Sequence, residues 1–168
     1  MKKMVILLLG VMALAVSASA TTVRWGLQTG NSLSDVTSGT IYLVYGTAPS
    51  ADTWKKDSFS VSDITGQQVA SGAVSEGFYY DSTGVVIEPK DIGQTGAGHR
   101  SFYAIAISAD GKTVAVSSQK SARIAAGTMN ATFGWEGGNF TTYTAVPEPC
   151  AVALLMLGVA AFGLKRRV

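Results

Sequence analysis

The chain has 168 residues, a formal net charge of +2, 47% hydrophobic residues and a single cysteine. Five of its 13 basic residues lie in the first three and last four positions, so residues 21–145 hold 8 basic and 10 acidic residues, a net charge of −2. A net-negative body lacks the cationic surface that nucleic-acid binding requires, which excludes that class of partner. Because Cys150 lies near the C-terminus, no disulfide can form within the body, and buried apolar surface must stabilise it.

Residues 1–20 predict a secretory signal peptide. Lys2 and Lys3 supply the positive n-region, and residues 4–16 form an apolar h-region. Ala18 and Ala20 then form an A-x-A cleavage site, so we expect the mature chain to begin at Thr21. The expected partners at this end are the Sec translocon and signal peptidase.

The composition of residues 21–138 predicts one all-β extracellular domain. Sixteen of the 19 glycines lie between residues 21 and 145, and no long segment shows a 3.6-residue period. We expect a small antiparallel β-sandwich or barrel-like domain, flanked by an N-terminal signal helix and a C-terminal transmembrane helix. Strands are expected at residues 22–28, 40–46, 67–74, 78–80, 85–88 and 131–134. Short helices are expected to open at Ser50 or Asp52 and at Ser62.

A β-hairpin is predicted over residues 101–118. Large side chains (Tyr103, Ile105, Ile107, Val114 and Val116) alternate with smaller ones, so they should share one face and enter one core. Asp110-Gly111 joins the two strands and is typical of a type I′ turn.

Catalytic and metal-binding signals are weak in the body. His99 is the only histidine, and with no cysteine in the body, Cys-His catalysis and a His/Cys zinc site are excluded. The glycine-rich stretch around His99 does not match a nucleophile elbow or a phosphate-binding loop. The carboxylates of Asp81, Asp91 and Asp110 do not follow the spacing of a calcium loop. We therefore predict no catalytic residue, no metal and no cofactor.

Paired carboxylates leave a small glycoside hydrolase open as an alternative. Glu76, Glu88 and Glu136 could supply such a pair, although nothing in the sequence brings two of them together.

Aromatic residues are the better binding candidates. Trp25 and Tyr80 are expected in the core. Trp54 lies beside two lysines and Trp135 lies in a glycine-rich segment, so these two are the candidates for exposed glycan contacts, with burial in the core as the alternative.

The C-terminal residues carry the most specific pattern. Residues 139–146 are rich in threonine and are expected to form a tether. Beyond it come Pro147, Glu148 and Pro149, then an apolar run over residues 151–164, and a basic cluster of Lys165, Arg166 and Arg167. About 14 apolar residues span ~21 Å as a helix, less than the ~30 Å of a bilayer core. An ordinary membrane anchor, the alternative, is normally longer.

This layout over residues 146–168 resembles the PEP-CTERM sorting signal, which the membrane protease exosortase is thought to recognise and remove. The resemblance implies that the protein is exported in a Gram-negative-type bacterium, is held transiently in the inner membrane, and then reaches the cell surface or extracellular matrix. It also implies an association with exopolysaccharide and biofilm. Together with the lack of a catalytic constellation, it predicts a non-enzymatic structural role. The alternative is a carbohydrate-binding module that uses exposed aromatics.

Overall fold

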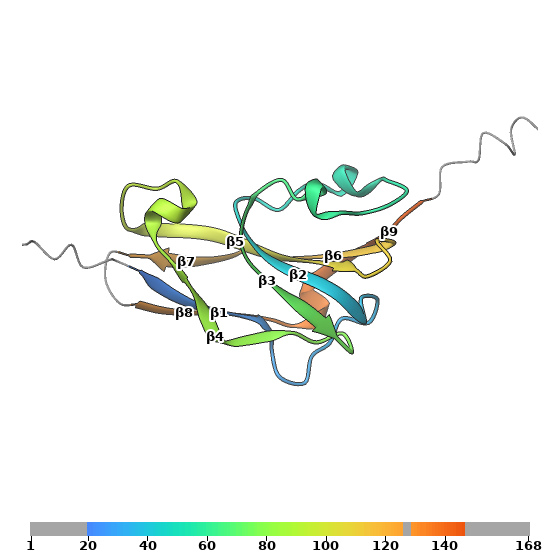
Figure 1. Cartoon of the computed structure of the whole chain (residues 1–168), viewed down its shortest axis with the longest axis horizontal. Helices are drawn as coiled ribbons and strands as arrows, with labels where there is room; N and C mark the ends of the chain where they lie inside the picture. The colour runs from blue at the N-terminus through green and yellow to red at the C-terminus, as the bar shows by residue number, and fades with distance from the viewer. Residues whose placement is uncertain (1–19, 126–128, 147–168) are drawn as a thin grey trace, which may run out of the picture.

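The computed structural model describes residues 20–125 and 129–146, which form two β-sheets stacked as a sandwich (Figure 1). The strands are β1 (Thr21–Leu27), β2 (Ser38–Tyr45), β3 (Gln67–Ser75), β4 (Tyr80–Ile87), β5 (Gly98–Ser108), β6 (Thr113–Ser117), β7 (Lys120–Ile124), β8 (Met129–Trp135) and β9 (Phe140–Thr144). Four short 3₁₀ helices, η1 (Ala51–Trp54), η2 (Val61–Asp63), η3 (Pro89–Ile92) and η4 (Gly137–Asn139), lie between them. The prediction of a β-rich domain with antiparallel sheets is confirmed.

One strand pair departs from the predicted antiparallel arrangement. The smaller sheet has the order β4-β1-β8, and β1 pairs with β8 in parallel, from Thr21 opposite Met129 to Leu27 opposite Trp135. The larger sheet, β3-β2-β5-β6-β9 with β7 also paired to β5, is antiparallel throughout. Because the chain crosses from one sheet to the other between β7 and β8, no hairpin forces β8 to run against its neighbour.

The main core lies between the two sheets. Trp25, Trp135, Phe102 and Phe133 are its large members, and each is at most 2% exposed. On β5, the small side chains of Ala104 and Ala106 belong to the same cluster. The predicted burial of Trp25 is confirmed, whereas Tyr80, also predicted in the core, is 39% exposed at the start of β4.

A second core covers the opposite face of the larger sheet. It contains the five large side chains that the hairpin pattern placed on one face: Tyr103, Ile105, Ile107, Val114 and Val116. The connection between β2 and β3, which contains η1 and η2, lies over this face (Figure 1) and contributes Trp54, Phe59 and Ile64. Both faces of the hairpin are therefore buried, as the large–small alternation predicts.

The hairpin itself is confirmed, but its turn type is not. Gly111 has φ +66°, while Asp110 is not among the residues with positive φ, and the amide of Gly111 donates to the carbonyl of Ser108 at 2.9 Å. A type I′ turn needs positive φ at both central residues, so that prediction is wrong. The Asp110 carboxylate instead accepts hydrogen bonds from the Ser108 hydroxyl and the Lys112 amide, which stabilises a longer loop with only one left-handed residue.

The predicted tether over residues 139–146 is wrong, because Phe140–Thr144 form β9. This strand pairs with β6 from Thr113 opposite Thr144 to Ser117 opposite Phe140. The amide of Ala145 then donates to Lys112, and that of Val146 donates to Lys56. Strand β7 was not predicted either, and β4 begins several residues before the expected 85–88. At 78–80 only Tyr80 belongs to a strand.

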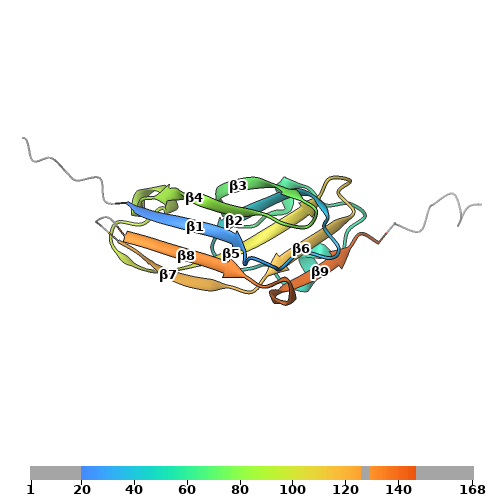
Figure 2. The ribbon, with the colours of Figure 1, turned by 90° about the horizontal axis from the view of Figure 1, so that it is seen from below.

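The signal helix and the transmembrane helix fall on residues 1–19 and 147–168, outside the described residues. Within 20–125 and 129–146, no helix is long and apolar enough to cross a membrane. The first and last described residues lie at opposite ends of the long axis (Figure 2).

Candidate functional site

The two predicted glycan contacts are buried. Trp135 has no exposed surface, and its indole N–H donates to the carbonyl of Ser118 at 2.9 Å. Trp54 is 2% exposed in the second core, where its ring centroid lies 6.0 Å from that of Phe59 and 6.2 Å from that of Tyr143. Neither ring can offer a face to a sugar, so the prediction that they are exposed is wrong. The prediction of exposure was based on the lysines beside Trp54 and the glycines beside Trp135, but the indole rings themselves point into the two cores.

Each of the three glutamates considered for hydrolysis lies in a separate turn or helix cap. Glu76 lies in the turn between β3 and β4, with φ +52°, and Glu88 lies at the other end of β4 as the N-cap residue of η3. Glu136 is the N-cap residue of η4. His99 is exposed on β5, opposite Arg123 of β7.

The aspartates considered for calcium each have a local structural role. Asp81 accepts hydrogen bonds from the amides of Thr83 and Gly84, and Asp91 accepts one from the amide of Glu88. Within residues 20–125 and 129–146, no group of three His, Cys, Asp or Glu residues could hold a metal ion.

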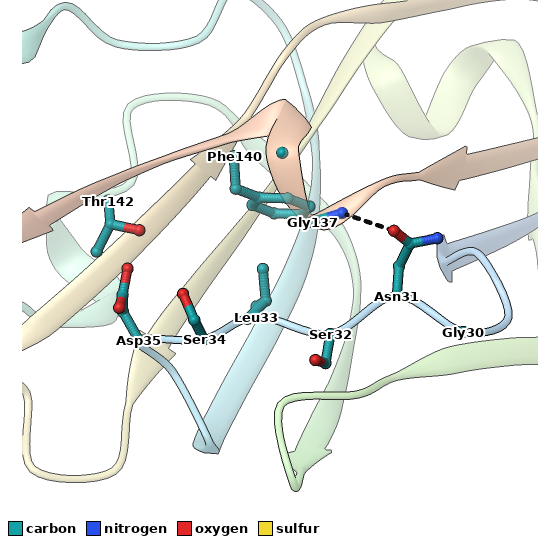
Figure 3. Close-up of a pocket in the computed structure, with 10 residues that line it drawn as sticks. Gly30, Asn31, Ser32, Leu33, Ser34, Asp35, Gly137, Phe140 and Thr142 are labelled. Carbon is teal, nitrogen blue, oxygen red and sulfur yellow. Dashed lines mark hydrogen bonds between the residues drawn. The ribbon is translucent and has the colours of Figure 1, made fainter.

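A polar cleft of about 470 Å³ opens between the loop after β1 and the β8–β9 connection (Figure 3). We call it the edge cleft, and we treat it as the candidate functional site. Its lining residues are Gly30, Asn31, Ser32, Leu33, Ser34, Asp35, Gly137, Gly138, Phe140 and Thr142. The sequence gives no signal for a site in this loop, because Gly-Asn-Ser residues are common in ordinary turns.

The loop side of the edge cleft is fixed by burial and backbone hydrogen bonds. Leu33 is 4% exposed in the main core, and Val36 is fully buried. The amide of Leu33 donates to the carbonyl of Gly77 at 2.8 Å, and the amide of Gly77 donates to Thr37 at 2.9 Å. A loop held in this way is preorganised, so a ligand would not have to bear the entropic cost of ordering it.

One end of the edge cleft is closed by a close approach of two backbones. The side-chain oxygen of Asn31 accepts a hydrogen bond of 3.4 Å from the amide of Gly137 (Figure 3). A Cβ atom on Gly137 would lie 2.5 Å from the carbonyl oxygen of Ser32. Only glycine therefore allows η4 to pack against the loop at this distance.

The β9 side of the edge cleft combines one aromatic ring with backbone groups that do not bond to β6. Phe140 is half-buried against the main core. The bonds from Ala145 to Lys112 and from Ser118 to Asn139 fix the alternation of the β6–β9 ladder. By this alternation Thr141 pairs with β6, whereas the amides and carbonyls of Phe140 and Thr142 face away from it. The Phe140 amide donates instead to the carbonyl of Gly137.

The chemistry of the edge cleft suits an uncharged polar ligand. Ser32, Ser34 and Thr142 offer hydroxyl groups that both donate and accept, and Asn31 offers an amide. Asp35 is the only ionisable residue among the lining residues. The cleft is a binding surface with several hydrogen-bonding groups and one ring, the combination by which proteins hold hydroxyl-rich molecules.

Comparison of the chain with protein families, with curated proteins and with solved structures finds no match in any of the three. The predicted sorting residues Pro147, Glu148, Pro149, Lys165, Arg166 and Arg167 lie outside the described residues, as does Ala18. Thr21, the predicted mature N-terminus, is the first residue of β1 and is fully buried. Its hydroxyl accepts a hydrogen bond of 3.1 Å from the amide of Ala125.

Proposed function

We propose that this protein is an exported, non-enzymatic component of the cell surface or extracellular matrix, associated with exopolysaccharide. In this proposal signal peptidase releases it after Ala20, and exosortase processes it at the signal over residues 147–168. The observation that carries the proposal is the position of the β-sandwich between these two signals. Strand β1 begins at Thr21, directly after the A-x-A site, and the backbone hydrogen bonds of the sandwich continue to Val146, directly before Pro147.

The C-terminal part of the proposal predicts a specific sorting defect. Replacing Pro147, Glu148 and Pro149 by alanine should leave the protein in the inner membrane, because exosortase would no longer recognise it. Fractionation of the producing cells measures this retention. A matched control replaces three exposed residues of the body, Ser58, Gln67 and Gln119, by alanine and should be exported normally. Normal release of the triple-alanine variant of the motif would contradict processing by exosortase.

Matrix association is tested by following the exported protein and the polysaccharide together. After mild washing, the protein should remain with the exopolysaccharide, and enzymatic degradation of the polysaccharide should release it. A protein that is released by washing alone, with the polysaccharide intact, would contradict the association.

A carbohydrate-binding module is the second candidate function, and the edge cleft favours it. The aromatics first expected to make the contacts are buried, so the binding surface shifts to Phe140 and the polar residues around it. Binding measured by calorimetry on the exported protein should weaken when Phe140 is replaced by alanine and be unchanged when Phe78, which is 39% exposed elsewhere, is replaced. Equal affinity in both variants would exclude the edge cleft as the binding surface.

A further inference from the structure

The edge cleft continues into two neighbouring depressions. Asp35 also lines a depression of about 260 Å³ with Thr37, Ser38, Ser108, Ala109, Asp110 and Thr113. Ser108 and Ala109 in turn line a third depression of about 340 Å³, together with Gly39, Thr40, Tyr42, Val61 and Ile107. Because each depression shares lining residues with the next, the three form one path around this end of the sandwich, which we call the end groove.

We propose that the end groove binds a linear glycan chain that carries no acidic groups. This inference rests on the proposed contact with exopolysaccharide and adds the chemical class of the polymer. A path made of three adjoining depressions suits several consecutive units of a chain better than one small molecule. Half-buried aromatic rings lie near its two ends, Phe140 in the edge cleft and Tyr42 in the third depression.

The charges of the end groove decide the class of glycan. Its only ionisable acidic or basic side chains are the carboxylates of Asp35 and Asp110, and no Lys, Arg or His lines it. The Ser108 hydroxyl, 2.6 Å from the Asp110 carboxylate, together with the Lys112 amide holds the pKa of that carboxyl below its usual range. The charge of Lys112 also lowers the pKa of the Asp110 carboxyl, but its ammonium donates to the carbonyl of Asp57 and is not part of the lining. A uronic acid or a sulfated sugar would therefore meet two carboxylates and no cation among the lining residues.

The remaining polar groups match sugar hydroxyls. Between the two rings the groove presents the hydroxyls of Ser34, Thr37, Ser38 and Thr113, which can donate to and accept from neighbouring hydroxyls of a glycan. The amide of Thr142 and the carbonyls of Phe140 and Thr142 do not bond to β6, and they add further hydrogen-bonding groups on the β9 side of the edge cleft.

Affinity electrophoresis of the full chain in mild detergent tests the class of ligand. The probes are neutral polysaccharides (dextran, galactomannan and xyloglucan) and carboxylated ones (polygalacturonate and alginate) cast in the gel. At least one neutral polysaccharide should retard the protein, with an affinity at least tenfold above that for either carboxylated one. Stronger retardation by a carboxylated polymer would overturn the inference but leave a carbohydrate-binding function. No retardation by any probe would overturn it too, and continued retention in the native matrix would then leave the proposed function standing.

A pair of glycine variants locates the binding surface without disturbing the fold. A Cβ atom on Gly138 or on Gly96 would meet no atom within 4 Å, and neither residue has a positive φ. Gly138 lines the edge cleft, whereas Gly96 lies in the loop before β5 and lines none of the three depressions. Gly138→Trp should weaken binding of the neutral polysaccharide at least tenfold, and Gly96→Trp should leave it unchanged. Equal affinity of the two variants for the polysaccharide would show that the glycan does not bind at the edge cleft.

A charge variant separately tests the preference for neutral over carboxylated polysaccharides. Asp35→Asn should raise the affinity for polygalacturonate several-fold relative to the neutral probe, because one of the two repelling carboxylates is removed. Asp52→Asn removes an exposed carboxylate that pairs with Lys55 in η1, away from the groove lining, and should not change this ratio. An unchanged ratio in Asp35→Asn would contradict the charge argument.

Discussion

The hairpin β5–β6 and strand β9 are neighbours in the same sheet, yet they carry very different sequence signals. In the hairpin, alternate residues of both strands point to opposite faces. Five large side chains enter the second core, whereas Phe102 and three alanines enter the main core. Strand β9 reads Phe-Thr-Thr-Tyr-Thr and lies at the edge of the sheet, with one partner strand. The difference shows that alternation identifies a strand buried on both faces. An edge strand rich in threonine, such as β9, lacks this alternation, and only its pairing with the neighbouring strand shows that it is a strand.

The largest expected effect tests the hairpin half of this comparison. Ile105 and Val114 have no exposed surface in the second core. Ile105→Asp or Val114→Asp would bury a carboxylate without a partner at a cost of several kcal/mol, comparable to the ~5–15 kcal/mol that stabilises a typical domain. We expect either variant to be unfolded by circular dichroism and tryptophan fluorescence. A folded variant with unchanged urea midpoint would contradict the second core.

The next effect concerns the tryptophans first expected at the surface. Trp135→Ala and Trp54→Ala should each lower the free energy of unfolding by about 3–5 kcal/mol, because each removes a large buried ring. Urea denaturation measures this loss. A change of less than about 1 kcal/mol, as for an exposed ring, would restore the earlier prediction.

A smaller effect distinguishes strand β9 from a tether. The amide of Thr141 faces β6 and that of Thr142 faces away from it, so proline should remove a ladder hydrogen bond only at the first position. We expect Thr141→Pro to cost about 2–3 kcal/mol and Thr142→Pro about 1 kcal/mol or less. In a tether, both substitutions would leave the urea midpoint unchanged.

The smallest effect is expected on the hairpin loop. Lys112 is exposed, and its ammonium donates only to the carbonyl of Asp57, at 3.3 Å. Lys112→Asp should therefore change the free energy of unfolding by about 0.5 kcal/mol or less. A larger loss in the same urea titration would mean that the loop contributes to the second core.

The elements predicted correctly from the sequence are those that a pattern of neighbouring residues determines. The alternation around Ile105 and Val114 identified both strands of the hairpin and the face that each residue takes. The expected short helices appear as η1 and η2, each a single turn. The turn type was missed because the hydroxyl of Ser108 and the carboxylate of Asp110 stabilise a different loop.

The edge cleft could not be predicted, because it forms only when segments distant in sequence meet. Its walls join residues 30–35 to residues 137–142, and the contact depends on Gly137 lying against Ser32. Neither segment has an unusual composition by itself. Burial of Trp54 and Trp135 likewise depends on what packs over them, which a single sequence does not show.

Processing at both ends is the central claim of the proposed function, and the intact mass of the exported protein tests it most directly. Our account predicts surface or matrix material that begins at Thr21 and lacks residues 151–168. Material that keeps residues 1–20, or that carries the full tail to Val168, would contradict it.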